Sequence, residues 1–130
     1  MRIEVSQLPP ATSSPNSRAG WRERHKEAKV YHDAVFYCCV DARNRAWIVG
    51  ADAVAFPFVK ARLDLTFVFP EYRRRDLDNT LSRAKPCLDA IVHSGLLLDD
   101  DAEHLEIGKV EIVVDPQRAP LTVIELQEDS

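Results

Sequence analysis

The chain has 130 residues, of which 45% are hydrophobic and 29% are charged, and these proportions are typical of one soluble globular domain. No stretch approaches the roughly 20 consecutive apolar residues of a membrane-spanning helix. The first residues, Met1-Arg2-Ile3-Glu4, lack the charged and apolar blocks of a signal peptide. We therefore expect a single domain over residues 1–130 that stays in the cytoplasm and has no membrane partner.

The net charge of −4 is distributed unevenly along the chain. Residues 1–85 hold 15 of the 17 Lys and Arg against 10 Asp and Glu, a net charge of +5. Residues 86–130 hold 2 basic against 11 acidic residues, a net charge of −9. Such asymmetry indicates a polyanionic partner for the basic half. A solvated surface alone would explain the acidic half.

Three cysteines, Cys38, Cys39 and Cys87, make an odd number, and none belongs to a spaced metal-ligand pattern such as C-x-x-C. In an intracellular protein such residues usually behave as small buried hydrophobes. We expect reduced thiols in the core, without a catalytic or redox role.

The first two predicted elements are a short strand and a long helix. In residues 2–6, Ile3 and Val5 alternate with polar neighbours, which is typical of a strand. A loop rich in Ser, Pro and Asn continues to residue 17. Over residues 21–45, apolar positions recur near helical spacing and predict an amphipathic helix with a basic N-terminal end. These apolar positions are Trp21, Ala28, Tyr31, Val35 and Cys38.

Residues 61–69 give the clearest strand, because apolar and more polar residues alternate until Pro70. A second helix is predicted over residues 76–94, with Asp78 or Asn79 as its N-cap and Gly95 at its C-terminal end. The inward positions of the strand are Leu63, Leu65, Phe67 and Phe69.

Pro86 interrupts the pattern of the second helix. A proline removes one backbone hydrogen bond and crowds the preceding turn, so we expect a kink or a late helix start near Ala84. Two strands, over residues 106–115 and 120–127, follow with a turn at Pro116-Gln117-Arg118. The order β-α-β-α-β-β predicts an α+β fold with two main helices on a mixed sheet, in which the last two strands form an antiparallel hairpin.

The densest group of reactive side chains lies where the clearest strand ends and the second helix begins, at Arg73-Arg74-Arg75-Asp76-Leu77-Asp78-Asn79. Asp76 and Asp78 can converge on one hard cation, and Mg²⁺ prefers oxygen ligands. The three arginines before them would attract a phosphate backbone. This segment predicts a site where a metal and a phosphate meet.

A second acidic group, Asp99-Asp100-Asp101, follows the same helix. Adjacent carboxylates repel one another unless solvent or a cation neutralises them. A solvated loop is the ordinary interpretation of such a triplet alone. Because two acidic groups flank one helix, a metal shared with Asp76 and Asp78 becomes the favoured interpretation.

Two further groups remain open. His104, with Glu103 and Glu106, is close enough to the triplet to be a ligand or a proton shuttle, although a surface histidine beside acids is more common. Trp21 could join a DNA-facing patch, although a tryptophan at the start of an amphipathic helix is more often core. The arginines around it, Arg18, Arg22 and Arg24, are better candidates, because phosphate contacts need only charge and reach.

The segment 73–79, followed by Lys85, Leu88-Asp89-Ala90-Ile91, Gly95 and Asp99-Asp100, resembles the signature of the RusA-like family of Holliday-junction resolvases. The similarity runs from about residue 63 to residue 114. The early Pro9-Pro10 and Ser14-Pro15-Asn16 also resemble the family's opening segment.

The resemblance implies a homodimeric endonuclease that resolves four-way DNA junctions in recombination and repair, with Mg²⁺ held by Asp76, Asp78 and Asp100. It also implies an essential lysine, which the family pattern places where this chain has Ser82. Counting back from Asp89-Ala90, Lys85 fits this role if three extra residues follow Asn79. We assign DNA contacts to the arginines Arg73, Arg74, Arg75, Arg18 and Arg22.

Two other functions remain open at this point. A noncatalytic DNA-binding module would use the same basic residues, with the acids serving only as a solvated face and a helix cap. A nuclease for other branched DNA or for RNA would share the acidic site but not the preference for junctions. Either Lys85 or Arg75 would stabilise charge that develops on the scissile phosphate of a nuclease.

Overall fold

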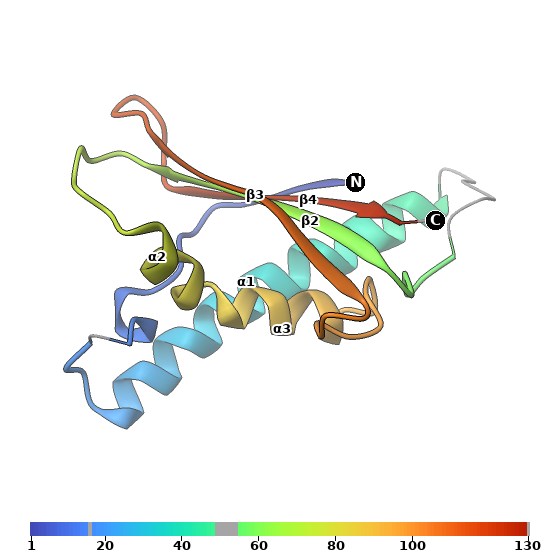
Figure 1. Cartoon of the computed structure of the whole chain (residues 1–130), viewed down its shortest axis with the longest axis horizontal. Coiled ribbons are helices and arrows are strands. Elements are labelled where there is room, and N and C mark those ends of the chain that lie inside the picture. The colour runs from blue at the N-terminus through green and yellow to red at the C-terminus, as the bar shows by residue number, and fades with distance from the viewer. Residues whose placement is uncertain (16, 49–54, 130) are drawn as a thin grey trace.

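The computed structural model describes residues 1–15, 17–48 and 55–129. Three α-helices lie on one side of a four-stranded sheet (Figure 1). The elements in chain order are β1 (Arg2–Val5), the short 3₁₀ helix η1 (Ala11–Ser13), α1 (Trp21–Ile48), β2 (Ala61–Phe69), α2 (Leu77–Arg83), α3 (Lys85–His93), β3 (Leu105–Val114) and β4 (Leu121–Glu128).

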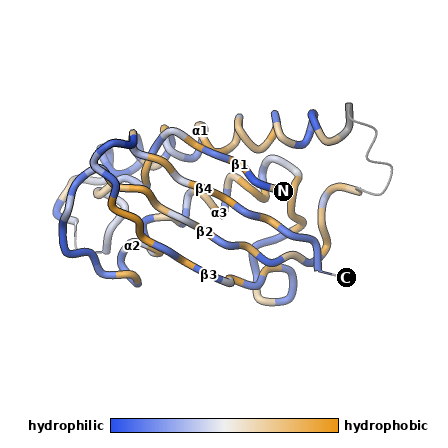
Figure 2. The backbone as a smooth tube through the Cα atoms, turned by 90° about the horizontal axis from the view of Figure 1, so that it is seen from above, coloured by the Kyte–Doolittle hydropathy of each residue, from blue (hydrophilic) through white to orange (hydrophobic). Residues whose placement is uncertain are grey.

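The strands follow the order β1-β4-β2-β3 across the sheet, as Figure 2 shows from above. β2 pairs parallel with β3, whereas β4 pairs antiparallel with both β1 and β2. The α+β class and the mixed sheet are confirmed, but the expected hairpin of β3 and β4 is wrong. Residues 115–120 instead cross the end of β2, where the Asp115 amide donates to the Phe69 carbonyl at 2.9 Å.

Burial gives the physical reason for this order. In β4 the consecutive residues Thr122, Val123 and Ile124 are all buried, and a strand covered on both faces belongs inside a sheet. β2 is similar, since Val68 is buried between the inward-facing Phe67 and Phe69. The two most buried strands therefore pair with each other, and β3 takes the edge.

The predicted second helix is divided in two, which changes the expected number of main helices from two to three. Pro86 lies in the first turn of α3, where its missing amide removes no helical hydrogen bond. The break falls at Ala84, so the expected kink is confirmed. Gly95 has a φ of +86° and ends α3 as predicted. The N-cap prediction is wrong, because Asp76 caps α2.

Helix α1 contributes Tyr31, Val35 and Cys39 to the core. Trp21, which the helical spacing placed on the same face, is 75% exposed, so the core interpretation of this residue is wrong. The first turns of α1 extend below α2 and away from the sheet, beyond the reach of the four described strands (Figure 1). Within the described ranges, no helix is long and apolar enough to cross a membrane.

The cysteines match the sequence prediction, since all three are unpaired thiols. Cys39 and Cys87 are buried and Cys38 is half-buried. Burial raises the pKa of the Cys39 thiol to about 12, and it also raises the pKa of Cys87. A thiol that stays protonated at neutral pH is a poor nucleophile, which agrees with a structural role.

Candidate phosphate and metal site

The loop between β2 and α2 carries the predicted site. Asp76 is the N-cap of α2, and one of its carboxylate oxygens accepts a hydrogen bond from the Asp78 amide at 3.2 Å. Asp78 lies in the first turn and is exposed. Its carboxylate makes no hydrogen bond or ion pair with any other described residue. Both carboxylates therefore keep oxygen atoms available to a ligand at the positive end of a helix dipole.

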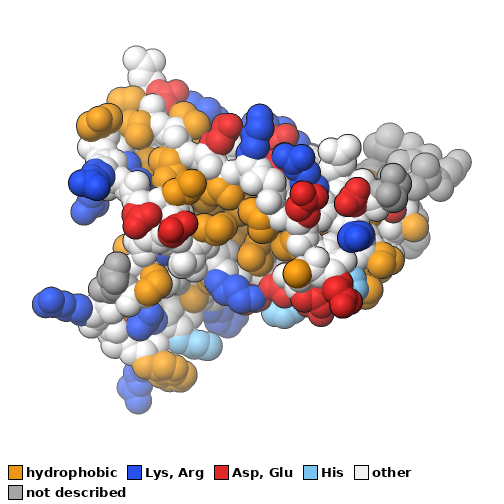
Figure 3. All heavy atoms as spheres, in the orientation of Figure 1, with side chains coloured by type: hydrophobic (Ala, Val, Ile, Leu, Met, Phe, Trp, Pro, Cys, Tyr) orange, Lys and Arg blue, Asp and Glu red, His pale blue; other side chains and the backbone are white. Residues whose placement is uncertain are grey.

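A pocket of about 970 Å³ opens beside this loop. Among the described residues, four arginines and two acids, Glu71 and Asp76, line it. The arginines are Arg73, Arg74, Arg75 and Arg83. In Figure 3, Asp and Glu side chains gather over the loop before β3. Lys and Arg side chains are prominent at the end of the molecule that carries the β2–α2 loop, although acidic side chains lie there too, and both kinds alternate over the sheet.

Two of the four guanidinium groups are held in place. The Arg75 guanidinium lies 3.8 Å from the centre of the Phe69 ring, and it donates to the carbonyls of Glu71 at 3.0 Å and Arg73 at 3.2 Å. A cation fixed over an aromatic ring loses less side-chain entropy when it binds an anion. Arg73 and Arg74 are exposed.

Arg83 reaches the same pocket from α2. Its guanidinium donates to the Pro9 carbonyl at 2.7 Å and to the Pro10 carbonyl at 3.3 Å, which joins the N-terminal loop to the helix. Burial lowers the pKa of Arg83, and the neighbouring charges of Arg75 and Arg73 lower it further. An anion in the pocket would relieve this repulsion, so the site favours a bound phosphate or carboxylate.

Arg83 was not among the predicted site residues, although it lines the pocket, which Asp78 does not. The available signal was helical spacing: Arg83 lies four residues after Asn79 and seven after Asp76, and both of these residues line the pocket.

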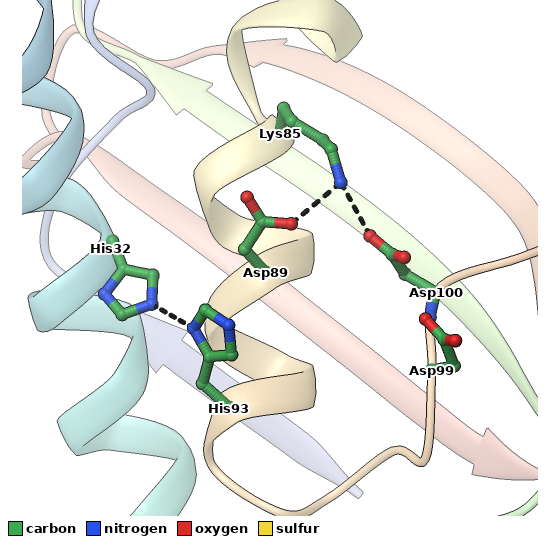
Figure 4. Close-up of polar contacts among 6 residues, drawn as sticks. All are labelled: His32, Lys85, Asp89, His93, Asp99 and Asp100. Carbon is green, nitrogen blue, oxygen red and sulfur yellow. Dashed lines mark hydrogen bonds and ion pairs between the residues drawn. The ribbon is translucent and has the colours of Figure 1, made fainter.

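The second predicted group centres on Lys85, at the start of α3. Its ammonium group donates to the carboxylates of Asp89 and Asp100, each at 2.7 Å (Figure 4). These two hydrogen bonds raise the pKa of Lys85, and Lys85 in turn lowers the pKa of Asp100. The structure therefore brings together two predicted site residues that are distant in sequence. Asp89 was missed as a partner, although its i, i+4 spacing from Lys85 indicated it.

The aspartate triplet is divided between two sets of contacts. Asp100 pairs with Lys85, whereas Asp101 accepts hydrogen bonds from the His104 ring and from the backbone amides of Glu103 and His104. The His104 hydrogen bond lowers the pKa of Asp101. Asp99 accepts a hydrogen bond from the Asp100 amide at 2.7 Å.

The arrangement of possible metal ligands differs in part from the predicted one. In residues 1–15, 17–48 and 55–129, Asp99, Asp101 and His104 form a group of three possible metal ligands. Their ligand atoms all lie within 4.8 Å of one another. Asp76, Asp78 and Asp100 do not form such a group within these ranges. Exposed acidic groups of this kind are common without a metal. One oxygen of Asp100, Oδ2, is already engaged by Lys85.

Arg18 and Arg22, the other predicted DNA contacts, lie just before α1 and in its first turn. Both are exposed, and neither lines the arginine pocket. Neither forms a hydrogen bond or ion pair with another residue in the described part of the chain. They lie apart from that pocket, at the N-terminal end of α1.

No protein-family model matches this chain, and no curated protein matches it significantly. The resemblance to RusA-like resolvases therefore rests on the residues quoted for it, most of which surround α2 and α3.

Proposed function

We propose that this chain is a Mg²⁺-dependent endonuclease that cuts branched DNA and prefers four-way junctions. The observation that carries the proposal is the pocket lined by four arginines beside the exposed carboxylates of Asp76 and Asp78. Hydrolysis of a phosphodiester needs cations that hold the phosphate and oxygen ligands that hold a metal. The two requirements meet at one strand-to-helix junction.

The residues have distinct roles in this proposal. The pocket arginines hold phosphates and position the DNA without reading its sequence. Asp76, Asp78 and Asp100 would hold Mg²⁺, which supplies polarisation of the phosphate and activation of a water molecule. Asp76 and Asp78 suit the ion, because Asp78 is unengaged by other described residues and Asp76 uses one oxygen as a helix cap, whereas Asp100 is paired with Lys85 and would have to join them. Lys85 stabilises negative charge that develops on the phosphate during hydrolysis.

We further propose that the active form is a homodimer and that it acts in recombination and repair in the cytoplasm. A four-way junction has approximate twofold symmetry. A dimer with a twofold axis presents two equivalent sites to two opposed strands, so that both can be cut. Assembly would then be a requirement of paired cleavage.

A noncatalytic DNA-binding module is the second candidate. The observation that favours it is the separation of the possible metal ligands, since Asp100 is engaged by Lys85 rather than grouped with Asp76 and Asp78. Such a module would bind junctions equally well with Mg²⁺ or with a chelator, and it would not cut them under either condition.

The test is cleavage of a synthetic four-way junction by the full chain, compared with linear duplex, flap DNA and RNA, each with Mg²⁺ and with a chelator. The proposal expects paired cuts in the junction that require Mg²⁺. Glu111→Gln, which removes one exposed carboxylate on β3, is the matched control for substitutions of the proposed metal ligands and should cut normally. Binding without any cutting would establish the noncatalytic module, and preferential cutting of flap DNA or RNA would contradict the junction preference.

A further inference from the structure

A second pocket lies between the free end of α1 and the break between α2 and α3. It has a volume of about 420 Å³, within the range of roughly 300–1,000 Å³ common for small-ligand sites. We call it the Trp21 pocket. Its lining residues come from three segments and are Ser13, Ala19, Trp21, Arg24, His25, Ala28, Ser82, Lys85 and Pro86.

The indole of Trp21 is the most unusual part of this pocket. Trp21 is 75% exposed and lines the pocket, so its apolar surface is accessible to a ligand there. One face of the indole is stacked on His25, with ring centres 5.3 Å apart and planes inclined by 11°. The stack fixes the orientation of the indole and leaves its other face available to another flat ring.

The charged residues of the pocket indicate that a ligand stacked on Trp21 would also carry a negative group. Its titratable lining residues are Arg24, His25 and Lys85, and no Asp or Glu is among the described residues that line it. Arg24 is anchored by hydrogen bonds to the carbonyls of Thr12 at 3.0 Å and Ser14 at 3.3 Å. Lys85 is also paired with Asp89 and Asp100, whereas Arg24 makes no ion pair with a described residue, so Arg24 is the cation of the pocket whose charge is not already balanced. An aromatic platform with such a cation beside it matches a nucleotide, whose base stacks while its phosphate is held by charge.

Lys85 connects this pocket to the candidate active site, because it lines the Trp21 pocket and also pairs with Asp100. Ser82, on the opposite side of the α2–α3 break, donates to the Asp78 carbonyl at 3.0 Å and keeps its hydroxyl oxygen available as an acceptor. A nucleotide in the pocket would therefore lie next to the residues proposed to act on the phosphodiester.

We propose that the Trp21 pocket binds one unpaired nucleotide of a DNA substrate, with its base stacked on Trp21 and its phosphate held by Arg24 and Lys85. This inference rests on the proposed function for the identity of the polymer. Bases at a branch point unstack more easily than bases within a duplex. The pocket would thus favour branched over linear DNA without reading a sequence.

The test measures binding of a short fluorescent oligothymidine and of a linear duplex by anisotropy, with a chelator present so that cleavage plays no part. Stacking on an aromatic side chain contributes enough that Trp21→Ala should raise the Kd for the single strand by about 5- to 100-fold. Trp21→Phe should give an intermediate Kd, and both variants should bind duplex as the wild type does. Circular dichroism should show an unchanged fold, because the side chain is exposed.

Tyr37→Ala is the matched control, since Tyr37 is a 69% exposed aromatic residue further along the same helix. This variant should bind the single strand within twofold of the wild type. A second measurement uses Trp47→Phe, which leaves Trp21 as the remaining tryptophan. Oligothymidine should quench its fluorescence, as stacking requires.

Unchanged single-strand affinity in Trp21→Ala, equal weakening of duplex binding, or absence of quenching would each overturn the inference. These results are distinguishable from failure of the proposed function. If the wild type binds oligothymidine through Trp21 but never cuts a junction, the proposed pocket stands and the proposed endonuclease function is refuted. If a Trp21→Ala variant cuts and binds normally, the endonuclease function stands and the proposed pocket is refuted.

Discussion

Replacement of Lys85 by Met separates the structural role of this residue from its proposed catalytic role. Methionine keeps an unbranched side chain of similar length and removes the charge. The wild-type ammonium group lies 2.7 Å from carboxylate oxygens of both Asp89 and Asp100, but the Lys85 side chain is 60% exposed. Exposed ion pairs contribute roughly 0.2–1 kcal/mol each, so the variant should lose less than about 2 kcal/mol of unfolding free energy.

The loss should depend on pH in a way that the two pKa shifts define. Lys85 lowers the pKa of Asp100, so the stabilisation is complete above the ordinary Asp value of about 3.9 and is lost as the pH falls through the folded-state pKa. The pKa of Lys85 is raised, so its contribution is complete below about 10.4 and is lost as the pH rises through the folded-state value. The stability difference should be constant between about pH 5 and pH 9.

Urea unfolding of both proteins at pH 7 and near pH 3 measures this difference. Lys29→Met is the matched control, because Asp33 at 2.9 Å is the one ion-pair partner of Lys29 among the described residues, so this variant should give a smaller loss. Cleavage of a junction by Lys85→Met should fall by about 100- to 1,000-fold if the lysine stabilises charge on the phosphate. A stability difference that is the same at pH 3 and pH 7 would refute the ion pair, and normal cleavage would refute the catalytic role.

Three further predictions concern DNA binding, the core and assembly. Alanine at residues 73–75 should flatten the salt dependence of junction affinity, measured by anisotropy, because fewer counterions are released; an unchanged slope would place the DNA elsewhere. Tyr31→Phe should cost about 1 kcal/mol in urea unfolding. The Thr122 hydroxyl donates to the Gln7 carbonyl at 2.6 Å, so the Tyr31 hydroxyl is the donor to Thr122 Oγ1 at 3.0 Å. The substitution removes this hydrogen bond, and an unchanged stability would contradict the assignment of Tyr31 as the donor. Sedimentation at micromolar concentration should show a dimer, and a monomer that makes paired cuts would refute the symmetric arrangement.

Local patterns were sufficient to predict most elements. The alternation in residues 61–69 gave the bounds of β2, because a strand with one face on a core must repeat every two residues. Pro86 located the break at Ala84, since a proline amide cannot take part in the helical hydrogen bonds. Both effects depend only on near neighbours in the sequence.

The partners of the strands depend on distant residues, and here the sequence prediction failed. The turn-forming Pro116-Gln117-Arg118 suggested a hairpin, but the same segment is long enough to cross one strand. The position of Trp21 failed for a similar reason. Helical spacing indicates which residues share a face, but it does not indicate that the sheet ends before the first turns of α1.

The candidate site was predictable to the extent that it is local. The arginines and aspartates of residues 73–78 are contiguous, so their common location followed directly. The pairing of Lys85 with Asp100 spans 15 residues and follows from the packing of α3 beside the loop before β3. The contact of Arg83 with Pro9 spans 74 residues, and no local pattern indicated it.

Cleavage and binding by Asp78→Asn and Asp100→Asn show whether these carboxylates hold a catalytic metal. Each substitution keeps the shape of the side chain and removes one negative charge from the proposed metal site, which should weaken Mg²⁺ binding. With Mg²⁺ and a synthetic four-way junction, we expect cleavage by each variant to fall by more than about 100-fold while junction affinity persists or rises. Variants that cut the junction at the wild-type rate would contradict the assignment of these carboxylates as metal ligands.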